Sequence, residues 1–394
     1  MNIILTESQL ASIVQSTITE RLGVPEHLLK SSTELFKTIV DAIKNNSKNF
    51  ISAGYVRRYR YDIDGEYKIG DRVVKNVIFD LILYSIKNPD LTEPKITEFS
   101  HYSDRQTDMN YKTMSSHGDM EKIHLGVTIF APKKWKIDME HIGNLILMNE
   151  RFNTSFAHEL MHAYEEYKNP KETTYDRADY RSYIDTKFTI FPMSRLLQCL
   201  YFVHNIENSV RPAEIASEMG YNNVTRETFR DFVKENSVFV ALDAIKSLTY
   251  DSFRGDLLDY LPEIASDLRR KSLWNIFNWF KRKSPTEQID EFLIASYKEL
   301  TKTKHEKLNQ VLGTNFFDKM VAYAFLKNDK EKVINDYIKD STRFDNNPLD
   351  FYKYEIKKIS FIAEKMYKKV SKLYDLLPPS VEDGSGNIPL NKSK

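Results

Sequence analysis

Apolar residues near the start of the chain recur at intervals of three and four, the period of a helix with one buried face. One set consists of Leu10, Ile13, Val14 and Ile18 and follows a Thr-x-x-Gln capping box at residues 6–9. A second set runs from Leu35 to Ile43 and ends near Asn45. The pattern therefore predicts an N-terminal helical arm over residues 1–48.

After Gly54 the pattern changes to the alternation and β-branched composition of strands. Strands are predicted over residues 55–64, 73–86, 95–99 and 121–132, with turns at Gly65 and Gly70. These segments and the helix that follows them predict a mixed α+β core over residues 49–220.

From about Ser194 onward, helical spacing dominates. Helices are predicted over residues 195–208, 212–219, 226–248, 287–310, 314–328 and 350–376. Pro378 and Pro379 end the last of them, and a polar segment follows. We therefore predict a mainly helical C-terminal region over residues 221–377 and a disordered tail over residues 378–394.

Composition excludes several classes of function. The 57 Lys and Arg residues nearly balance the 56 Asp and Glu residues, so the charge predicts no nucleic-acid partner. A single cysteine, Cys199, rules out an intrachain disulfide framework and a cysteine-based zinc site. Residues 1–22 do not form a signal peptide, and no apolar run is long enough for a transmembrane segment. These features predict a soluble protein synthesised in the cytoplasm.

The strongest chemical signal is the pentapeptide His158-Glu159-Leu160-Met161-His162, an HExxH sequence. On a helix, histidines four residues apart project from one face and can bind one Zn²⁺, while the glutamate reaches a metal-bound water. The sequence predicts such a helix, capped at Asn153 or Thr154 and stopped at Asn169-Pro170. The alternative is an ordinary amphipathic helix with solvated or hydrogen-bonded histidines.

A catalytic zinc site needs a third protein ligand. The position that would carry a third histidine in a metzincin is Lys168, which disfavours that class. A later glutamate is the alternative, and we predict Glu214, 52 positions after His162, in a helix that has Pro212 in its first turn. Glu218 and Glu207 remain rival ligands. Glu214 could also simply stabilise the start of its helix through the helix dipole.

The segment from Phe156 to Glu165, with Ala213 to Ala216 downstream, resembles zinc metallopeptidases of the gluzincin type, in particular peptidase-like proteins of large bacteriophages. The opening residues 3–10 are also similar to the start of many phage proteins. The resemblance implies a zincin-like core and a metalloendopeptidase-like activity, but it does not identify the substrate. The predicted partners are a protein or peptide substrate and, if the phage association holds, virion proteins. It also implies that strand 121–132 forms the rim of the cleft, although an internal strand is the alternative.

The predicted mechanism assigns His158, His162 and Glu214 to Zn²⁺, with Glu159 as the general base that activates the zinc-bound water. Candidate donors to the oxyanion are Tyr164, Tyr201 and His204, and His117 and His124 are candidate lining residues. The rival hypothesis is a structural or virion-associated protein that retains a zincin fold with little or no turnover.

Overall fold

The structure is a computed structural model, and it describes residues 16–18, 20–45, 50–52, 56–86, 95–102, 120–132, 138–148, 150–168, 173–270, 283–312, 339 and 342–377. The chain forms two compact units, each assembled from separate stretches of sequence. The first unit contains Met1–Lys168, Val210–Asn236 and Lys369–Lys394, and the second contains Asn169–Ser209 and Ser237–Lys368. The domain bounds at residues 48, 220 and 377 stay predictions.

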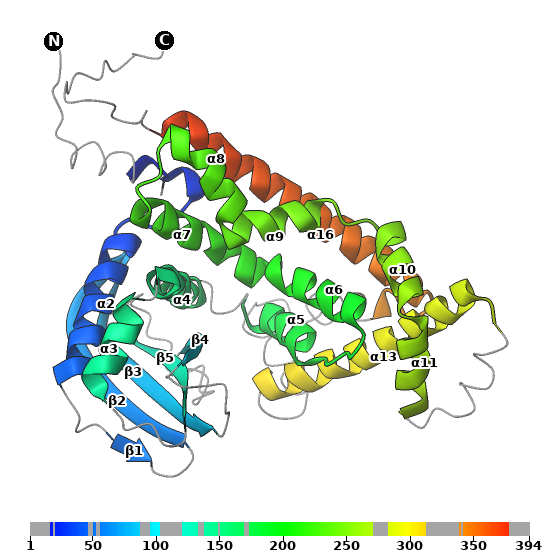
Figure 1. Cartoon of the computed structure of the whole chain (residues 1–394), viewed down its shortest axis with the longest axis horizontal. Helices are drawn as coiled ribbons and strands as arrows, with labels where there is room; N and C mark the ends of the chain where they lie inside the picture. The colour runs from blue at the N-terminus through cyan, green and yellow to red at the C-terminus, as the bar shows by residue number, and fades with distance from the viewer. Residues whose placement is uncertain are drawn as a thin grey trace. The chain divides into compact units, whose positions relative to one another are not determined.

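A five-stranded mixed sheet forms the base of the first unit (Figure 1). Its strands are β1 (Phe50–Ser52), β2 (Val56–Ile69), β3 (Arg72–Ile86), β4 (Lys95–Tyr102) and β5 (Met120–Pro132), in the spatial order β1-β2-β3-β5-β4. Strands β3 and β5 are parallel, and the other neighbours are antiparallel. The mixed α+β class and the predicted strands are confirmed, but Gly65, which was expected in a turn, lies inside β2, where the pairing with β3 shifts register between Asp64 and Tyr67.

One face of this sheet carries the core. Tyr61, Phe79 and Leu125 are aligned on β2, β3 and β5 and are almost fully buried. Two helices, α2 (Leu28–Asn45) and α4 (Glu150–Lys168), pack against each other and against strands of the sheet. The rings of Phe36 and Phe156 join the two helices, with centroids 5.7 Å apart. The helix that carries the HExxH sequence is therefore anchored to the sheet through its apolar side.

Asp80 points away from this core, because alternate residues of a strand face opposite sides of a sheet. Its side chain is nonetheless fully buried (0% exposed). Two arginines on β2 cover it: Arg60 donates two hydrogen bonds of 2.9 Å, and Arg58 forms a second ion pair. The pairing neutralises a buried carboxylate between two strands.

The turn between β2 and β3 is fastened to α4. Gly70 adopts a positive φ of 59°, which favours glycine, and a Cβ at this position would lie 3.0 Å from the Tyr164 hydroxyl. That hydroxyl donates a 3.2 Å hydrogen bond to Asp71. The hydrogen bond and the close approach at Gly70 therefore fix the position of the β2–β3 turn relative to α4.

The remaining helices follow the sequence pattern in most places. Helix α3 (Met139–Met148), most of α7 (Asn205–Tyr221), α8 (Arg226–Glu235) and η3 (Lys372–Leu376) belong to the first unit. The second unit contains α5 (Thr173–Asp185), α6 (Phe191–Phe202), α9 (Ser237–Lys246), α10 (Tyr250–Asp259), α11 (Leu261–Arg270), α13 (Pro285–Leu312) and most of α16 (Pro348–Ser371). Within it, α5 packs against α6 and α13, and α10 also packs against both of these.

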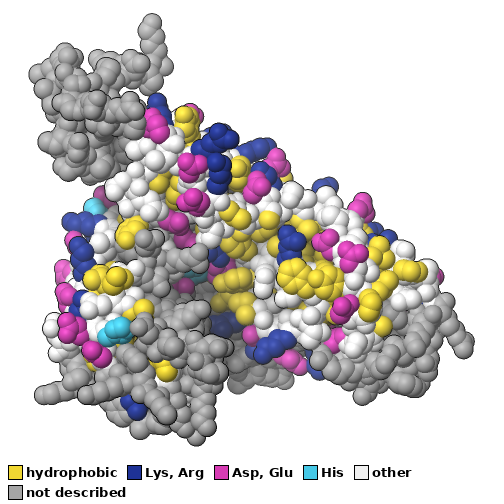
Figure 2. Space-filling view, viewed as in Figure 1, with side chains coloured by type: hydrophobic (Ala, Val, Ile, Leu, Met, Phe, Trp, Pro, Cys, Tyr) yellow, Lys and Arg dark blue, Asp and Glu magenta, His cyan; other side chains and the backbone are white. Residues whose placement is uncertain are grey.

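Several predictions fall outside the described residues, namely the helix at 314–328 and the tail at 378–394. Among the helices that the structure describes, none has the length and apolar character to span a membrane. Figure 2 shows Lys and Arg side chains intermingled with Asp and Glu side chains over the described part of the visible face. The local charge distribution on that face thus agrees with the near balance of charge in the whole chain.

Candidate metal centre

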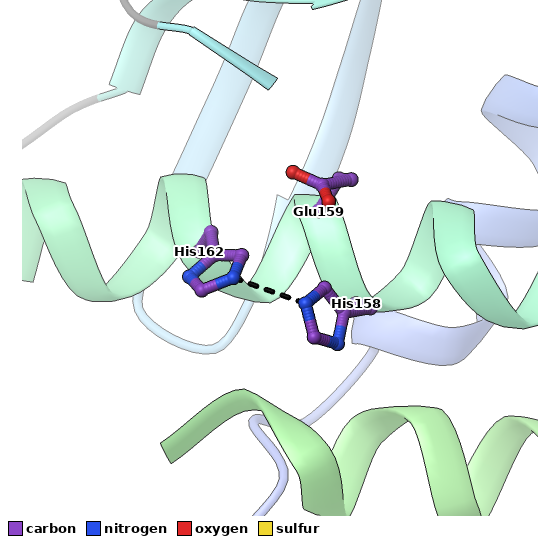
Figure 3. Close-up of side chains that lie close together, drawn as sticks. All are labelled: His158, Glu159 and His162. Atoms are coloured by element: carbon purple, nitrogen blue, oxygen red, sulfur yellow. Dashed lines mark hydrogen bonds between the residues drawn. The ribbon is translucent and has the colours of Figure 1, made fainter. Parts of the chain in front are cut away.

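Helix α4 presents the predicted pair of histidines on one turn (Figure 3). Phe156 and Leu160 are fully buried on its core side, and His158 and His162 lie on an adjoining face. The helix ends at Lys168, as Asn169-Pro170 predicts, but it begins at Glu150. The predicted cap at Asn153 or Thr154 is therefore wrong, because the helix already has a full turn before those residues.

The two imidazoles face each other through their Nε2 atoms, which lie 3.0 Å apart. Their ring planes are nearly perpendicular, at 80°. A tetrahedral zinc ion bonded to both nitrogens would hold them roughly 3.3 Å apart. The observed separation is therefore close to that of a zinc-bound pair, and both residues are buried (8% and 7% exposed).

Glu159 completes a cluster with the histidines. One carboxylate oxygen and one nitrogen of each imidazole all lie within 4.8 Å of one another. In the described part of the chain, no other three His, Cys, Asp or Glu residues meet in this way. Glu159 is partly exposed, unlike the buried histidines on either side of it. It is therefore positioned to meet a water molecule and the imidazole pair at once.

Glu214 reaches this site from α7. Its Oε2 lies 3.2 Å from His158 Nδ1, the ring nitrogen that faces away from His162, and it accepts a 2.8 Å hydrogen bond from Arg211. Burial alone would raise the pKa of Glu214, but the contact with His158 and the charge of Arg211 outweigh it and lower the pKa to about 2. Glu214 is thus an ionised partner of His158, on the side opposite the shared Nε2 centre. Its assignment as a metal ligand stays a prediction.

Small residues line the buried side of α7. Ala213 and Ala216 are fully buried. Pro212, in contrast, was expected in the first turn and lies inside α7. Proline has no N–H, so the helix lacks a bond to the Asn208 carbonyl next to the segment that carries Arg211 and Glu214.

The rival glutamates have other surroundings. Glu218 accepts a 2.7 Å hydrogen bond from the amide of Asn236. Glu207 is buried and belongs to the second unit. Glu214, in contrast, contacts His158 Nδ1 directly.

One predicted oxyanion donor has a hydrogen-bond partner of its own and two lie in the second unit, so their role stays a prediction. The Tyr164 hydroxyl donates a hydrogen bond to Asp71 at the β2–β3 turn. Burial and, to a smaller extent, the negative charge of Asp71 raise the pKa of the Tyr164 hydroxyl. Tyr201 and His204 belong to the second unit. His117 and the side chain of His124 lie outside the described residues.

The rim strand was assigned wrongly. Strand β5 is paired on both sides, to β3 and β4, so residues 120–132 form an internal strand. The edge of the described sheet on this side is β4, which packs against α4. The sequence gives no direct signal for this order, because β4 precedes β5 in the chain but lies outside it in the sheet.

In a comparison with known proteins, no family model, no curated protein and no solved structure matches the chain. The chemistry of the site must therefore be argued from its own residues.

Proposed function

We propose that this chain is a zinc-dependent metallopeptidase that hydrolyses peptide bonds with a zinc-activated water. The observation that carries the proposal is the cluster on α4: two buried Nε2 atoms 3.0 Å apart, with the Glu159 carboxylate within 4.8 Å. Nitrogen and oxygen donors at this spacing suit Zn²⁺, and the HExxH arrangement combines a metal site with a base.

Each residue has a separate task in this proposal. His158 and His162 bind the metal, which when present lowers the pKa of its water and polarises the scissile carbonyl. Glu159 accepts the proton of the attacking water and delivers it to the leaving amine. Because Glu159 is more exposed than the histidines, it can exchange protons with a bound substrate.

The contact between Glu214 and His158 also supports metal binding. A carboxylate beside Nδ1 keeps a proton on that nitrogen, so Nε2 carries the lone pair, which can accept a hydrogen bond from His162 Nε2 or bind a metal. Arg211 in turn holds the carboxylate at 2.8 Å. Arg211 therefore holds Glu214, and Glu214 orients the metal ligand His158 without binding the metal itself. Ligation by Glu214 itself would require its side chain to leave Nδ1.

The sheet supports a peptide as the substrate. Strand β4 pairs with β5 on one side, and no described strand pairs with its other side. A free strand edge offers backbone N–H and C=O groups that an extended peptide can match. Since β4 also packs against α4, the sheet edge lies beside the helix that carries the histidines. This arrangement favours a zincin-like core within the predicted range 49–220.

The test begins with metal content. Protein purified without added chelator should contain about one zinc ion per chain by elemental mass spectrometry. His158→Ala and His162→Ala should lose it, whereas His141→Ala, at an exposed histidine of α3, should retain it. A wild-type protein that binds no zinc, even after dialysis against zinc, would refute the proposal.

Cleavage is tested separately with an unfolded protein substrate. Glu159→Gln should bind zinc as the wild type does and lose cleavage, while Glu165→Gln on the same helix should retain both. Zinc binding together with cleavage that is equal in Glu159→Gln would show that the proposed base is wrong. Zinc binding without any cleavage would instead indicate a structural metal in a protein with no turnover.

A further inference from the structure

The helical second unit contains a cavity of its own. About 200 Å³ lies among α5, α13 and α16, lined also by the segment around Val203 and His204. Every described lining residue belongs to the second unit. The cavity is therefore a separate candidate site, and its function does not depend on the metal centre.

Ion pairs form the polar part of its wall. The Lys304 ammonium forms an ion pair with Asp179 Oδ1 at 2.8 Å, although the angles do not meet those of a hydrogen bond. The Lys358 ammonium lies 3.7 Å from a carboxylate oxygen of Glu355. Burial raises the pKa of Glu355, and the positive charge of Lys358 lowers it by a smaller amount. Arg343 is a third lining cation, so the positive groups outnumber the two carboxylates. This balance favours an anionic occupant.

His204 adds a hydrogen-bonding atom that the protein leaves unused. Its Nδ1 is buried and has no hydrogen-bond partner in the part of the chain that the structure describes. The ring is held by the aromatic rings of Tyr180 and Tyr183, with centroids 6.4 and 6.2 Å away. Burial lowers the pKa of His204 to about 4, although the charge of Asp179 raises it, so the ring is neutral at pH 7. Buried polar atoms normally have partners, so a bound molecule or water is expected at Nδ1.

Aromatic side chains form another part of the wall. Phe351 contacts Tyr297 and Phe344, with ring centroids 5.3 and 5.7 Å apart, and Phe344 also contacts Tyr354. The guanidinium of Arg343 lies 4.3 Å from the centroid of the Tyr354 ring. Such a wall can stack against a flat apolar group while a cation remains beside it.

We propose that this cavity binds a small organic anion that carries an aromatic ring. The anionic group would contact Lys304 or Lys358, His204 Nδ1 would form a hydrogen bond to the ligand, and the ring would pack against the aromatic wall. The volume is below the range of about 300–1,000 Å³ for drug-sized ligands, so the ligand should be correspondingly small.

The proposal is tested on the full chain with four probes of similar shape: benzoate, phenyl phosphate, benzamide and benzylamine. Titration followed by ligand-observed NMR should show at least one of the two anions binding at least tenfold more tightly than the neutral and cationic probes. Tighter binding of benzoate would indicate a site for a carboxylate, and tighter binding of phenyl phosphate a site for a phosphate. Absence of binding, or equal binding of all four probes, would overturn the proposal and leave water as the occupant.

Variants locate the binding. His204→Leu should weaken binding of the preferred anion by roughly tenfold, the effect of losing one hydrogen bond to a charged group. His204→Asn places an amide near the position of Nδ1 and should recover most of the affinity. His305→Leu is the control, because His305 lies on α13 but does not line the cavity. Equal affinity in the wild type and His204→Leu, with both folded by circular dichroism, would contradict the assignment. The affinity should also be unchanged in His158→Ala, which separates this site from the proposed metal centre.

Discussion

Glu214 is the residue at which the sequence and the structure lead to different roles, so its replacement is the most informative experiment. The spacing predicts a metal ligand, whereas the structure places Oε2 3.2 Å from His158 Nδ1 and 2.8 Å from Arg211. Glu214→Gln keeps the size of the side chain and removes its charge. We predict that this change weakens zinc binding without removing zinc from its coordination by the two histidines.

Two estimates give the magnitude. The contact that orients His158 is a hydrogen bond to a charged group, worth about 1.5–3 kcal/mol, which corresponds to roughly 10- to 150-fold in affinity. Independently, loss of an outer carboxylate that orients a histidine ligand costs about 10–100-fold in metal affinity. Since the two ranges overlap, Glu214→Gln should raise the zinc dissociation constant by about 10–100-fold.

The assay is competition for zinc with a coloured chelator at neutral pH. Glu218→Gln is the matched control, because Glu218 lies one turn later on α7 and bonds to Asn236. Its zinc affinity should stay within about threefold of the wild type. The visible spectrum of the cobalt-substituted protein then reports the ligand set, and it should have the same shape in Glu214→Gln as in the wild type.

Two results would refute this reasoning. If Glu214→Gln binds zinc as tightly as the wild type, the carboxylate does not support His158. If the cobalt spectrum changes to that of a different ligand set, Glu214 is a ligand and its observed contact belongs only to the metal-free protein. A large loss in Glu218→Gln would move the ligand role to that residue.

Two further predictions concern stability, measured by urea unfolding. Asp80→Asn should lower the free energy of unfolding by about 2 kcal/mol, below the range for breaking a fully buried pair because Arg58 and Arg60 are about one-third exposed. Asp62→Asn, at an exposed position of β2, should change it by less than about 0.5 kcal/mol. Because the pKa of His204 is lowered to about 4, the unfolded chain binds a proton near pH 6.5 that the folded chain excludes. Stability should therefore fall by up to about 3 kcal/mol more in the wild type than in His204→Leu between pH 6.5 and 4, and parallel pH curves would contradict this.

The sequence predicts strands better than it predicts their order. Alternation and β-branched composition locate β2, β3 and β5, because these features depend on each strand's own two faces. The placement of β4 outside β5 depends on a parallel pair, β3 with β5, that no local pattern encodes. The rim strand was therefore misassigned although every strand involved was predicted.

The helices show a similar limit. Helix α5, at Thr173–Asp185, was not predicted, because its sequence is rich in charged residues and tyrosines and has little apolar periodicity. The interruption of the predicted helix at 226–248 was also missed. It falls at Asn236, whose side chain bonds to Glu218 and is almost fully buried. Both misses involve polar residues whose environment comes from other parts of the chain.

At the candidate site, the HExxH spacing places the two histidines correctly, since helical geometry alone brings residues four apart to one face. The long separation between His162 and Glu214 has an explanation in the division of the chain. Residues 169–209, including α5 and α6, belong to the second unit, and the chain rejoins the first unit at Val210. Soon after this return to the first unit, Glu214 contacts His158 and Arg211 donates a hydrogen bond to Glu214. Which nitrogen of His158 the carboxylate meets depends on where α7 lies in the folded unit, and not on any spacing in the sequence. For this reason the motif predicts the metal-binding pair, while the role of its distant carboxylate has to be decided by the zinc affinity of Glu214→Gln.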